Sequence, residues 1–600
     1  MIEDLKLDLP KLDFGSRFRS LACCLLLIVP ALLLLMYITI FSVNTLYTDD
    51  WAMAHLLMKA MNGTLSLSDL FQQYNEHRIL FPRITMLALG RLTQYNTVSW
   101  MFLSWILILL TGLLVFKRFR GGSDGHLRSL TVFLPVSLLL FGFRQSESIL
   151  WGFTCQIYLM IFGTVATFYL LEKSKRIDIW FALSLLTGIV ASFSFLIGLI
   201  VWPVAFVQIL LRKISNGKKD VQSMTCWCLT GVLVYGSYLY GFVRPAPHLG
   251  SAWYLGGGPP PLANPLTHPV QTILYFLTLI GAPFSYDALT AAALGFVIAP
   301  IAFLILVQAY KAKLFPKNRM WLSLTIFAAL SSFATTIGRS VVGVDQALTS
   351  RYTPVTILGI IGLYFLAVSN YKLPSRIVIS RSFGAHALLI IIILGLVTTY
   401  AGGWRAAEET RYSREVGAYV LRTYKIQSDE NIRNYLCFGS ISPETIRQFS
   451  PFLEQNKLSV FSEKIIDPST LMLVDNPRFS TNLDTINGKT ISQMSSPIVV
   501  NSSQLETMTI VGWAVDSRTG DVASAVFVNI DNRIDVPALY GIDRPDVAEY
   551  FKNPKYRFSG YVATFSMSIL DKGEHTISFK IISQDQHHYY TQYTYHIVVN

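Results

Sequence analysis

The 600-residue sequence predicts a polytopic α-helical membrane protein that carries a small all-β domain at its C-terminal end. Hydrophobic residues make up 52% of the chain and charged residues only 14%, which excludes a disordered chain and an ordinary soluble enzyme. Residues 1–400 hold 30 basic and 15 acidic side chains, whereas residues 401–600 hold 19 and 22. The apolar part therefore carries an excess of +15 and the tail −3, which add up to the net charge of +12, and no nucleic-acid partner is expected.

Long apolar runs predict about eleven membrane-spanning helices within residues 1–402, which we expect to form one domain. A helix needs about 20 mostly apolar residues to cross a hydrocarbon core of roughly 30 Å. The first run is too long for a signal peptide and lacks a small-residue cleavage site, so we expect it to be retained. The expected spans are 21–42, 98–116, 129–143, 148–171, 178–194, 196–211, 221–242, 288–310, 320–338, 355–369 and 385–402.

Basic residues gather in alternate loops and predict the orientation of the chain. With the N-terminus in the cytoplasm, the basic clusters of five loops also lie inside, and eleven crossings place the tail outside. The apolar segment 269–283 would reverse this order if it crossed fully, so we expect it to be interfacial or re-entrant. The five cytoplasmic clusters are 117–120, 173–176, 212–219, 311–319 and 372–381.

Fifteen ionisable side chains remain on the predicted outer face, where a charge is costly unless it is paired or functional. Asp49-Asp50 stands between the first span and two helices predicted to lie at the interface, at 51–61 and 79–92, with a cap-like Ser68-Asp69 between them. Asp50 could simply cap the first of these helices. A carboxylate in this place could equally act as a general base or as a metal ligand.

A second cluster comprises Glu76, His77, Arg78 and Arg83. Arg78 could pair with Glu76 at the surface, a contact of small energetic value. Arg78 and Arg83 could instead clamp a phosphate group, because guanidinium forks match phosphate oxygens. We favour the clamp.

Two later loops supply the third and fourth clusters. Arg144 and Glu147 could form a structural ion pair, or Arg144 could bind the substrate or its lipid phosphate and Glu147 could be a second catalytic carboxylate. Arg339 and Arg351, with the donors of Tyr352 and its neighbours, suit an anionic lipid headgroup. Asp345 could pair with one of these two arginines instead.

The tail predicts an extracytoplasmic helical linker over 403–500 and a β-sandwich over 501–600. Its tyrosines and Trp513 could stack on sugar rings, although aromatic residues that alternate along strands also form cores. Cys437 is the only cysteine of the tail, so we expect no disulfide there, and His587-His588 lacks companions for a metal site. The predicted helices are 404–425 and 443–455, and the predicted strands are 508–515, 525–530, 561–569, 575–582 and 589–599.

An acidic pair after the first span, interfacial helices, an acid in the second outer loop and arginines on later outer loops resemble the GT-C glycosyltransferases. The resemblance covers residues 20–402 and implies transfer of a hexosyl or pentosyl group from a polyprenyl-phosphate donor, with inversion. It makes Asp49 the first candidate for the base, Asp50 its partner or a metal ligand, and Glu147 the second-loop acid. Arg339 and Arg351 resemble the phosphate-binding arginines of the family.

The same resemblance implies an acceptor in the cell envelope, which could be a glycan such as O-antigen, a lipid or a protein. It places the chain in a bacterial inner membrane, with the reaction at the periplasmic face. The pair is Asp-Asp where Asp-Glu is commoner, and no sequon-recognition motif is apparent, so protein N-glycosylation is not expected. Whether a divalent cation takes part is left open.

A transporter or flippase of lipid-linked saccharides is the alternative function. Transporters usually place ionisable residues at the bilayer midplane and often contain internal repeats. Here the charges lie at one face and we find no repeat, which favours chemistry at the membrane surface. A third class, an envelope receptor or scaffold, would not need clustered outer arginines.

Overall fold

The computed structural model describes residues 14–120, 126–212, 220–243, 263–371, 378–437, 441–464, 466–475, 478, 480–494, 497–501 and 506–600. Much of the basic clusters predicted at 212–219 and 372–381 lies outside these residues. The chain divides into two compact units. The first unit comprises Met1–Ser42, Thr64–Leu89 and Val98–Thr410, and the second comprises Val43–Gly63, Gly90–Thr97 and Arg411–Asn600.

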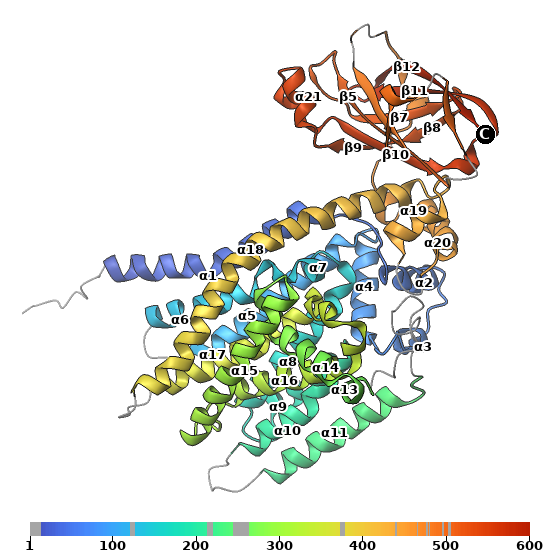
Figure 1. Ribbon diagram of the computed structural model, residues 1–600. Coiled ribbons are helices and arrows are strands. Elements are labelled where there is room, and N and C mark those ends of the chain that lie inside the picture. The colour runs from blue at the N-terminus through green and yellow to red at the C-terminus, as the bar shows by residue number, and fades with distance from the viewer. Residues whose placement is uncertain are drawn as a thin grey trace, which may run out of the picture. The chain divides into compact units, whose positions relative to one another are not determined.

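Every predicted span is occupied by a helix of the first unit (Figure 1). Six helical segments are long and apolar enough to cross a membrane, and four further apolar helices among the described residues are shorter. The multi-pass helical fold is therefore confirmed, and the count of eleven crossings stays a prediction. The helices that occupy the spans are α1 (Phe14–Phe41), α5 (Val98–Arg120), α6 (His126–Leu140), α8 (Cys155–Lys173), α9 (Ile179–Ser192), α10 (Val201–Leu210), α11 (Val221–Leu239), α15 (Ala288–Lys311), α16 (Arg319–Arg339), α17 (Thr353–Tyr371) and α18 (Val378–Arg422).

The apolar segment predicted at 269–283 forms α14 (Pro269–Gly281), a helix of 13 residues. At about 1.5 Å per residue it extends roughly 20 Å, which is short of a hydrocarbon core. Glycines let α14 and α15 approach closely, because a Cβ at Gly281 would collide with the carbonyl oxygen of Ala291. The same holds for Gly295 and the carbonyl oxygen of Leu277.

The first outer loop contains both helices that the sequence predicts, α2 (Asp50–Met61) and α4 (Leu80–Leu92). A short α3 (Leu67–Phe71) lies between them; its N-cap is Ser66, and of the predicted cap-like Ser68-Asp69 it is Asp69 that takes part, as the third residue of a capping box. The Ser66 hydroxyl accepts from the Asp69 N–H at 3.2 Å, and the Asp69 carboxylate accepts from the Ser66 N–H at 2.9 Å. These reciprocal bonds satisfy two donors that a helix start otherwise leaves open.

The second unit contains the tail helices and two β-sheets that share one hydrophobic core. The first sheet has the order β1-β12-β11-β7-β8 with β4 on β12, and the second has β3-β2-β5-β10-β9 with β6 on β5. The helices are α19 (Asp429–Leu436), α20 (Pro443–Gln455) and α21 (Pro545–Tyr550). The strands are β1 (Met472–Leu473), β2 (Thr481–Ile486), β3 (Lys489–Thr490), β4 (Ile498–Val500), β5 (Thr507–Asp516), β6 (Asp521–Val522), β7 (Ala525–Ile530), β8 (Ile534–Pro537), β9 (Leu539–Ile542), β10 (Gly560–Ser566), β11 (Gly573–Ile582) and β12 (His588–Val599).

The domain boundaries predicted at 402 and 501 do not coincide with breaks in the secondary structure or the sheets. Helix α18 continues through 402 without a break, and β1 to β4 precede residue 501 yet pair with strands that follow it. β2 pairs with β5, and β4 pairs with β12. These early strands are short, and both residues of β1 and of β3 are exposed, so they show no apolar alternation in the sequence.

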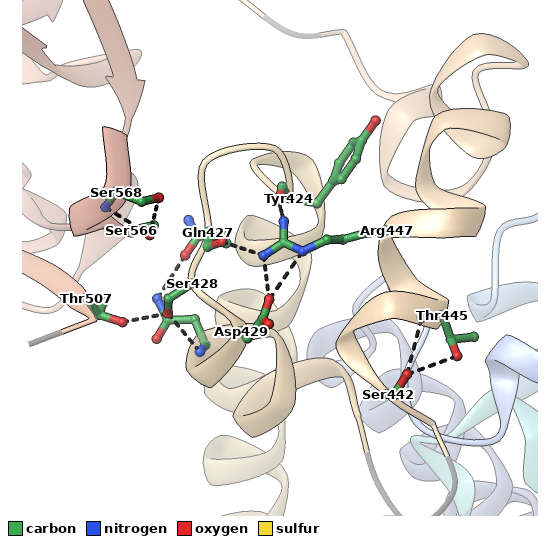
Figure 2. A network of polar contacts seen from close by, with 11 residues as sticks. Tyr424, Gln427, Ser428, Asp429, Ser442, Thr445, Arg447, Thr507, Ser566 and Ser568 are labelled. Atoms are coloured by element: carbon green, nitrogen blue, oxygen red, sulfur yellow. Dashed lines mark hydrogen bonds and ion pairs between the residues drawn. The ribbon is translucent and has the colours of Figure 1, made fainter. Parts of the chain in front are cut away.

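The predicted linker is tied to the two-sheet domain by side-chain hydrogen bonds (Figure 2). Ser428, the N-cap of α19, bonds the Thr507 hydroxyl at 2.6 Å. Arg447 of α20 donates to the carbonyl oxygens of Tyr424 and Gln427 at 2.8 Å each and to Asp429 at 2.7 Å. The end of α18, α19, α20 and the sheets therefore form one body.

Asp516 joins the ends of β5 and β11 and should be a principal determinant of the stability of the two-sheet domain. It is fully buried and accepts from the Ser583 hydroxyl at 2.7 Å and from the Gln584 N–H at 3.0 Å. We expect Asp516→Ala to destabilise the domain by about 3 kcal/mol, because buried donors would lose a charged acceptor. Thermal unfolding of the purified protein checks this, with the exposed Asp571→Ala as control; equal midpoints for the two variants would contradict it.

Candidate active site

An ion pair between Glu76 and Arg339 organises the candidate site of the first unit. Arg339, at the end of α16, donates from Nη2 to Glu76 Oε1, so it joins the first outer loop and not Asp345. The two side chains are 36% and 26% exposed, so the pair is reachable from solvent. The Nε2 atom of His77 lies 3.8 Å from the same carboxylate oxygen.

The ring of His77 is held by two contacts. It stacks on Phe195 with ring centroids 4.1 Å apart, and its Nδ1 accepts from the Leu196 N–H at 3.3 Å. Burial lowers the pKa of His77 to about 4 against the opposing effect of Glu76, so the imidazole is neutral at pH 7.

Glu76 is ionised at neutral pH. Burial alone would raise its pKa, but the charges of His77 and Arg339 outweigh burial and lower the pKa to about 2. Because His77 is neutral at pH 7, Arg339 is the partner that holds the carboxylate charged there.

Arg351 and Tyr352 line a small cavity next to this cluster. Phe195 forms part of the cavity wall and also carries the His77 ring, so the cavity adjoins the Glu76–Arg339 pair. The Tyr352 hydroxyl accepts from Gln346 Nε2 at 2.9 Å. The other lining side chains include the hydroxyl groups of Ser331, Ser332, Thr335 and Thr356 and the apolar groups of Ile157, Ile197, Leu279 and Val355.

The structure thus brings together five of the predicted site residues: Glu76, His77, Arg339, Arg351 and Tyr352. At neutral pH, the two guanidinium groups and one carboxylate leave this cluster with a net charge of about +1, since His77 is neutral. Positive charge, hydroxyl groups and apolar side chains therefore meet at this place in the first unit.

Arg78 and Arg83 bind backbone carbonyl oxygens. Arg78 donates from Nε to Tyr238 O at 2.7 Å and from Nη1 to Phe71 O at 3.0 Å, and Arg83 donates from Nη1 to Leu70 O at 2.9 Å. Both are buried, and among the described residues Arg78 forms no salt bridge with Glu76. These contacts hold the first outer loop in shape, and the phosphate clamp of the two arginines stays a prediction.

Arg144 and Glu147 do not pair with each other within the described part of the chain. Arg144 is buried over the Tyr286 ring at 4.4 Å and donates to Ser285 O at 2.9 Å, so the pair expected as the structural alternative is wrong. Glu147 is exposed and accepts from the N–H and hydroxyl of Ser350 at 3.4 Å each. Glu147 therefore lies beside the segment that carries Arg351.

Asp49 and Asp50 belong to the second unit. Asp50 begins α2, is buried and accepts from the Tyr47 N–H at 3.0 Å, whereas Asp49 is half-buried at the N-cap position and makes no side-chain capping bond. Asp50 therefore fastens the start of α2, although through the N–H of Tyr47 and not through an N–H of the helix. Asp49 is the more accessible carboxylate of the two.

Sequence reasoning missed the polar side chains that support this site. Tyr275 donates its hydroxyl to Gln346 Oε1, and Gln346 in turn donates to Tyr352. Ser331 and Ser332 lie on α16, and a pair of serines within an apolar helix is the signal that could have marked this face.

No family model matches the chain. It is 24% identical over 215 residues to an uncharacterized protein of Archaeoglobus fulgidus, and the match covers 34% of this chain and 53%, about half, of that protein. Among solved structures it is similar to ArnT from Cupriavidus metallidurans in the apo state, with 14% identity and a TM-score of 0.38 over 72% of this chain and 88% of that one. The same protein bound to undecaprenyl phosphate gives 12% identity and a TM-score of 0.37 over 72% of this chain and 89% of that one.

The described residues hold no group of three or more His, Cys, Asp or Glu side chains placed to bind a metal ion. A role for a divalent cation at the acidic pair stays a prediction.

The neutral, buried His77 should make the stability of the protein depend on pH. An unfolded histidine binds a proton below about pH 6.5, whereas His77 in the folded chain does so only near pH 4, so stability falls as the pH drops through this window. We expect wild type to lose about 3 kcal/mol between pH 7 and pH 4 through this residue, and His77→Asn to lose less. Thermal midpoints in detergent at pH 7, 5.5 and 4 check this, with the exposed His268→Asn as control; identical pH profiles for His77→Asn and wild type would contradict it.

Proposed function

We propose that the chain is a GT-C-type membrane glycosyltransferase that transfers a sugar from a polyprenyl-phosphate donor to an acceptor of the cell envelope. The observation that carries the proposal is the cluster of Glu76, His77, Arg339 and Arg351 beside a cavity with apolar walls. A lipid phosphate needs cationic donors for its oxygens and an apolar surface for its chain. This cluster provides both.

The proposed reaction is a single displacement with inversion. A carboxylate takes the proton of an acceptor hydroxyl group, and the acceptor oxygen forms a bond to the anomeric carbon of the sugar. The bond between that carbon and the phosphate oxygen breaks, and its electron pair leaves with the polyprenyl phosphate. Guanidinium groups stabilise the charge that develops on this leaving group.

We assign the roles from accessibility and contacts. Arg339 and Arg351 bind the phosphate, and Tyr352, fixed by Gln346, borders the same cavity. Asp49 is the proposed base, because Asp50 is buried and engaged with the Tyr47 N–H. Glu147 is exposed and is proposed as a second carboxylate that orients substrate hydroxyl groups.

The proposal includes the location of the reaction. The distribution of basic loops supports a cytoplasmic N-terminus, an outer rim that faces the periplasm of a bacterial inner membrane, and an exported tail. The acceptor would then be an envelope glycan such as O-antigen, a lipid or a protein. A transporter would move the lipid-linked sugar without releasing polyprenyl phosphate, so product release separates the two functions.

Asp49→Asn should abolish sugar transfer, because an amide cannot accept the proton of the acceptor hydroxyl. We expect a loss of at least about 10²-fold in kcat, with normal membrane insertion. Purified protein in lipid is incubated with a panel of polyprenyl-phosphate sugars, and release of polyprenyl phosphate is measured. Asp287→Asn is the matched control, since Asp287 caps α15 and asparagine caps equally well. If Asp49→Asn is as active as this control, Asp49 is not the base. If wild type releases no polyprenyl phosphate with any donor, the transporter is favoured.

Arg351→Ala should weaken use of the lipid donor by about 10- to 100-fold in kcat/KM, as expected for the loss of one charge-assisted contact to phosphate. Arg351→Lys should lose less kcat/KM than Arg351→Ala, because lysine retains the charge although it lacks the planar fork. The assay is the same, with Arg91→Ala as control, since Arg91 is an exposed arginine of the first outer loop. The phosphate-binding role is refuted if Arg351→Ala keeps the kcat/KM of wild type.

A further inference from the structure

The acidic pair lies on a segment that belongs, by its contacts, to the tail of the protein. Residues Val43–Gly63 and Gly90–Thr97 of the first outer loop form one compact unit with Arg411–Asn600. The candidate base is therefore held by residues that follow it by more than 350 positions in the sequence. The contacts within this unit show which tail residues hold the segment that carries the candidate base.

The two residues that precede Asp49 are both fastened to the tail. The guanidinium carbon of Arg414, on the polar end of α18, lies 3.1 Å from the ring centroid of Tyr47. The N–H of Thr48 donates to the carbonyl oxygen of Leu436, the last residue of α19, at 3.2 Å. Thr48 has a φ of 48°, a left-handed conformation that a β-branched residue adopts only when its surroundings enforce it.

The same loop has two further contacts with the tail at residues that follow the acidic pair. Helix α2 packs on α20, where the His55 and Phe449 rings lie 5.8 Å apart. The N–H of Ser459 donates to the carbonyl oxygen of Gln94 at 2.8 Å. The body that makes these contacts is stiff, because the bonds of Ser428 and Arg447 tie α18, α19 and α20 to one another and to the sheets (Figure 2).

We infer that Arg414 is a positioning residue for the candidate base Asp49, acting through Tyr47, and that the tail sets the geometry of the acidic pair. Tyr47 is the link, because Arg414 covers its ring while its N–H donates to the carboxylate of Asp50 at 3.0 Å. This inference rests on the proposed function. A displacement of about 1 Å in a catalytic group can lower the rate by about 10²-fold, so a small shift of this loop would lower kcat.

The test compares Arg414→Ala, Arg414→Lys and Arg433→Ala in the full-length protein. Arg433 is an exposed arginine on α19, so Arg433→Ala removes the same charge from the same unit without touching the loop. Arg414→Ala should lower kcat for release of polyprenyl phosphate by 10- to 100-fold with KM for the donor changed less than about 2-fold. Arg414→Lys should recover most of the rate, because it keeps a cation over the ring.

A second measurement reports the loop itself and does not require activity. Hydrogen exchange at the amides of residues 43–50 is followed by mass spectrometry. It should be at least about 5-fold faster in Arg414→Ala than in wild type or Arg433→Ala, because a short segment that loses one anchor opens more often. Unchanged exchange in Arg414→Ala overturns the inference, as does wild-type kcat in that variant. If wild type itself releases no polyprenyl phosphate from any donor, the proposed function fails, and the catalytic part of the inference fails with it. The exchange measurement still shows whether Arg414 holds the segment 43–50 in place.

Discussion

The ion pair between Glu76 and Arg339 is the contact on which the outer rim depends. It joins two segments 263 residues apart, the first outer loop and the end of α16. A charge near the membrane is costly unless it has a partner, so each member of the pair needs the other. His77 follows Glu76 directly, and the pair therefore also places the imidazole against Phe195 and next to the cavity that Arg351 lines.

The outer arginines differ in the acceptors that they use, and this difference has an electrostatic consequence. Arg78, Arg83 and Arg144 donate to backbone carbonyl oxygens, which satisfy N–H donors without cancelling charge. Arg339 uses a carboxylate, which does cancel charge. The carbonyl-bound arginines therefore stabilise the loops and also leave the rim with a positive field, which favours an anionic ligand.

The sequence predicted the regular elements well where a periodic pattern extends over a whole element. The apolar runs and the strand Ala525–Ile530 were recovered, since hydrophobic period is a local property. Strands β1 and β3 were missed because two-residue strands with exposed side chains carry no period. The places of β2 and β4 are set by pairing with β5 and β12, which come later in the chain.

The same limit applies to the candidate site. Composition marked Arg78, Arg83, Arg339 and Arg351 alike, because the sequence does not tell whether a guanidinium group binds backbone carbonyl oxygens or a carboxylate. The acceptors of Arg78 include Tyr238 O, 160 residues away, and only the fold brings them together. The tertiary structure likewise determines that Glu76 pairs with Arg339 and not with its neighbour Arg78.

The fold gives the two adjacent aspartates of the acidic pair different environments. Neighbouring side chains at the start of a helix diverge by about 100°, so Asp49 and Asp50 cannot present their carboxylates to one point as residues three or four positions apart can. Asp50 turns back to the Tyr47 N–H and is buried, while Asp49 remains half-buried. One acid of the pair thus secures the backbone that carries the other. This arrangement explains why two acids stand together and makes Asp49 the better candidate for proton transfer.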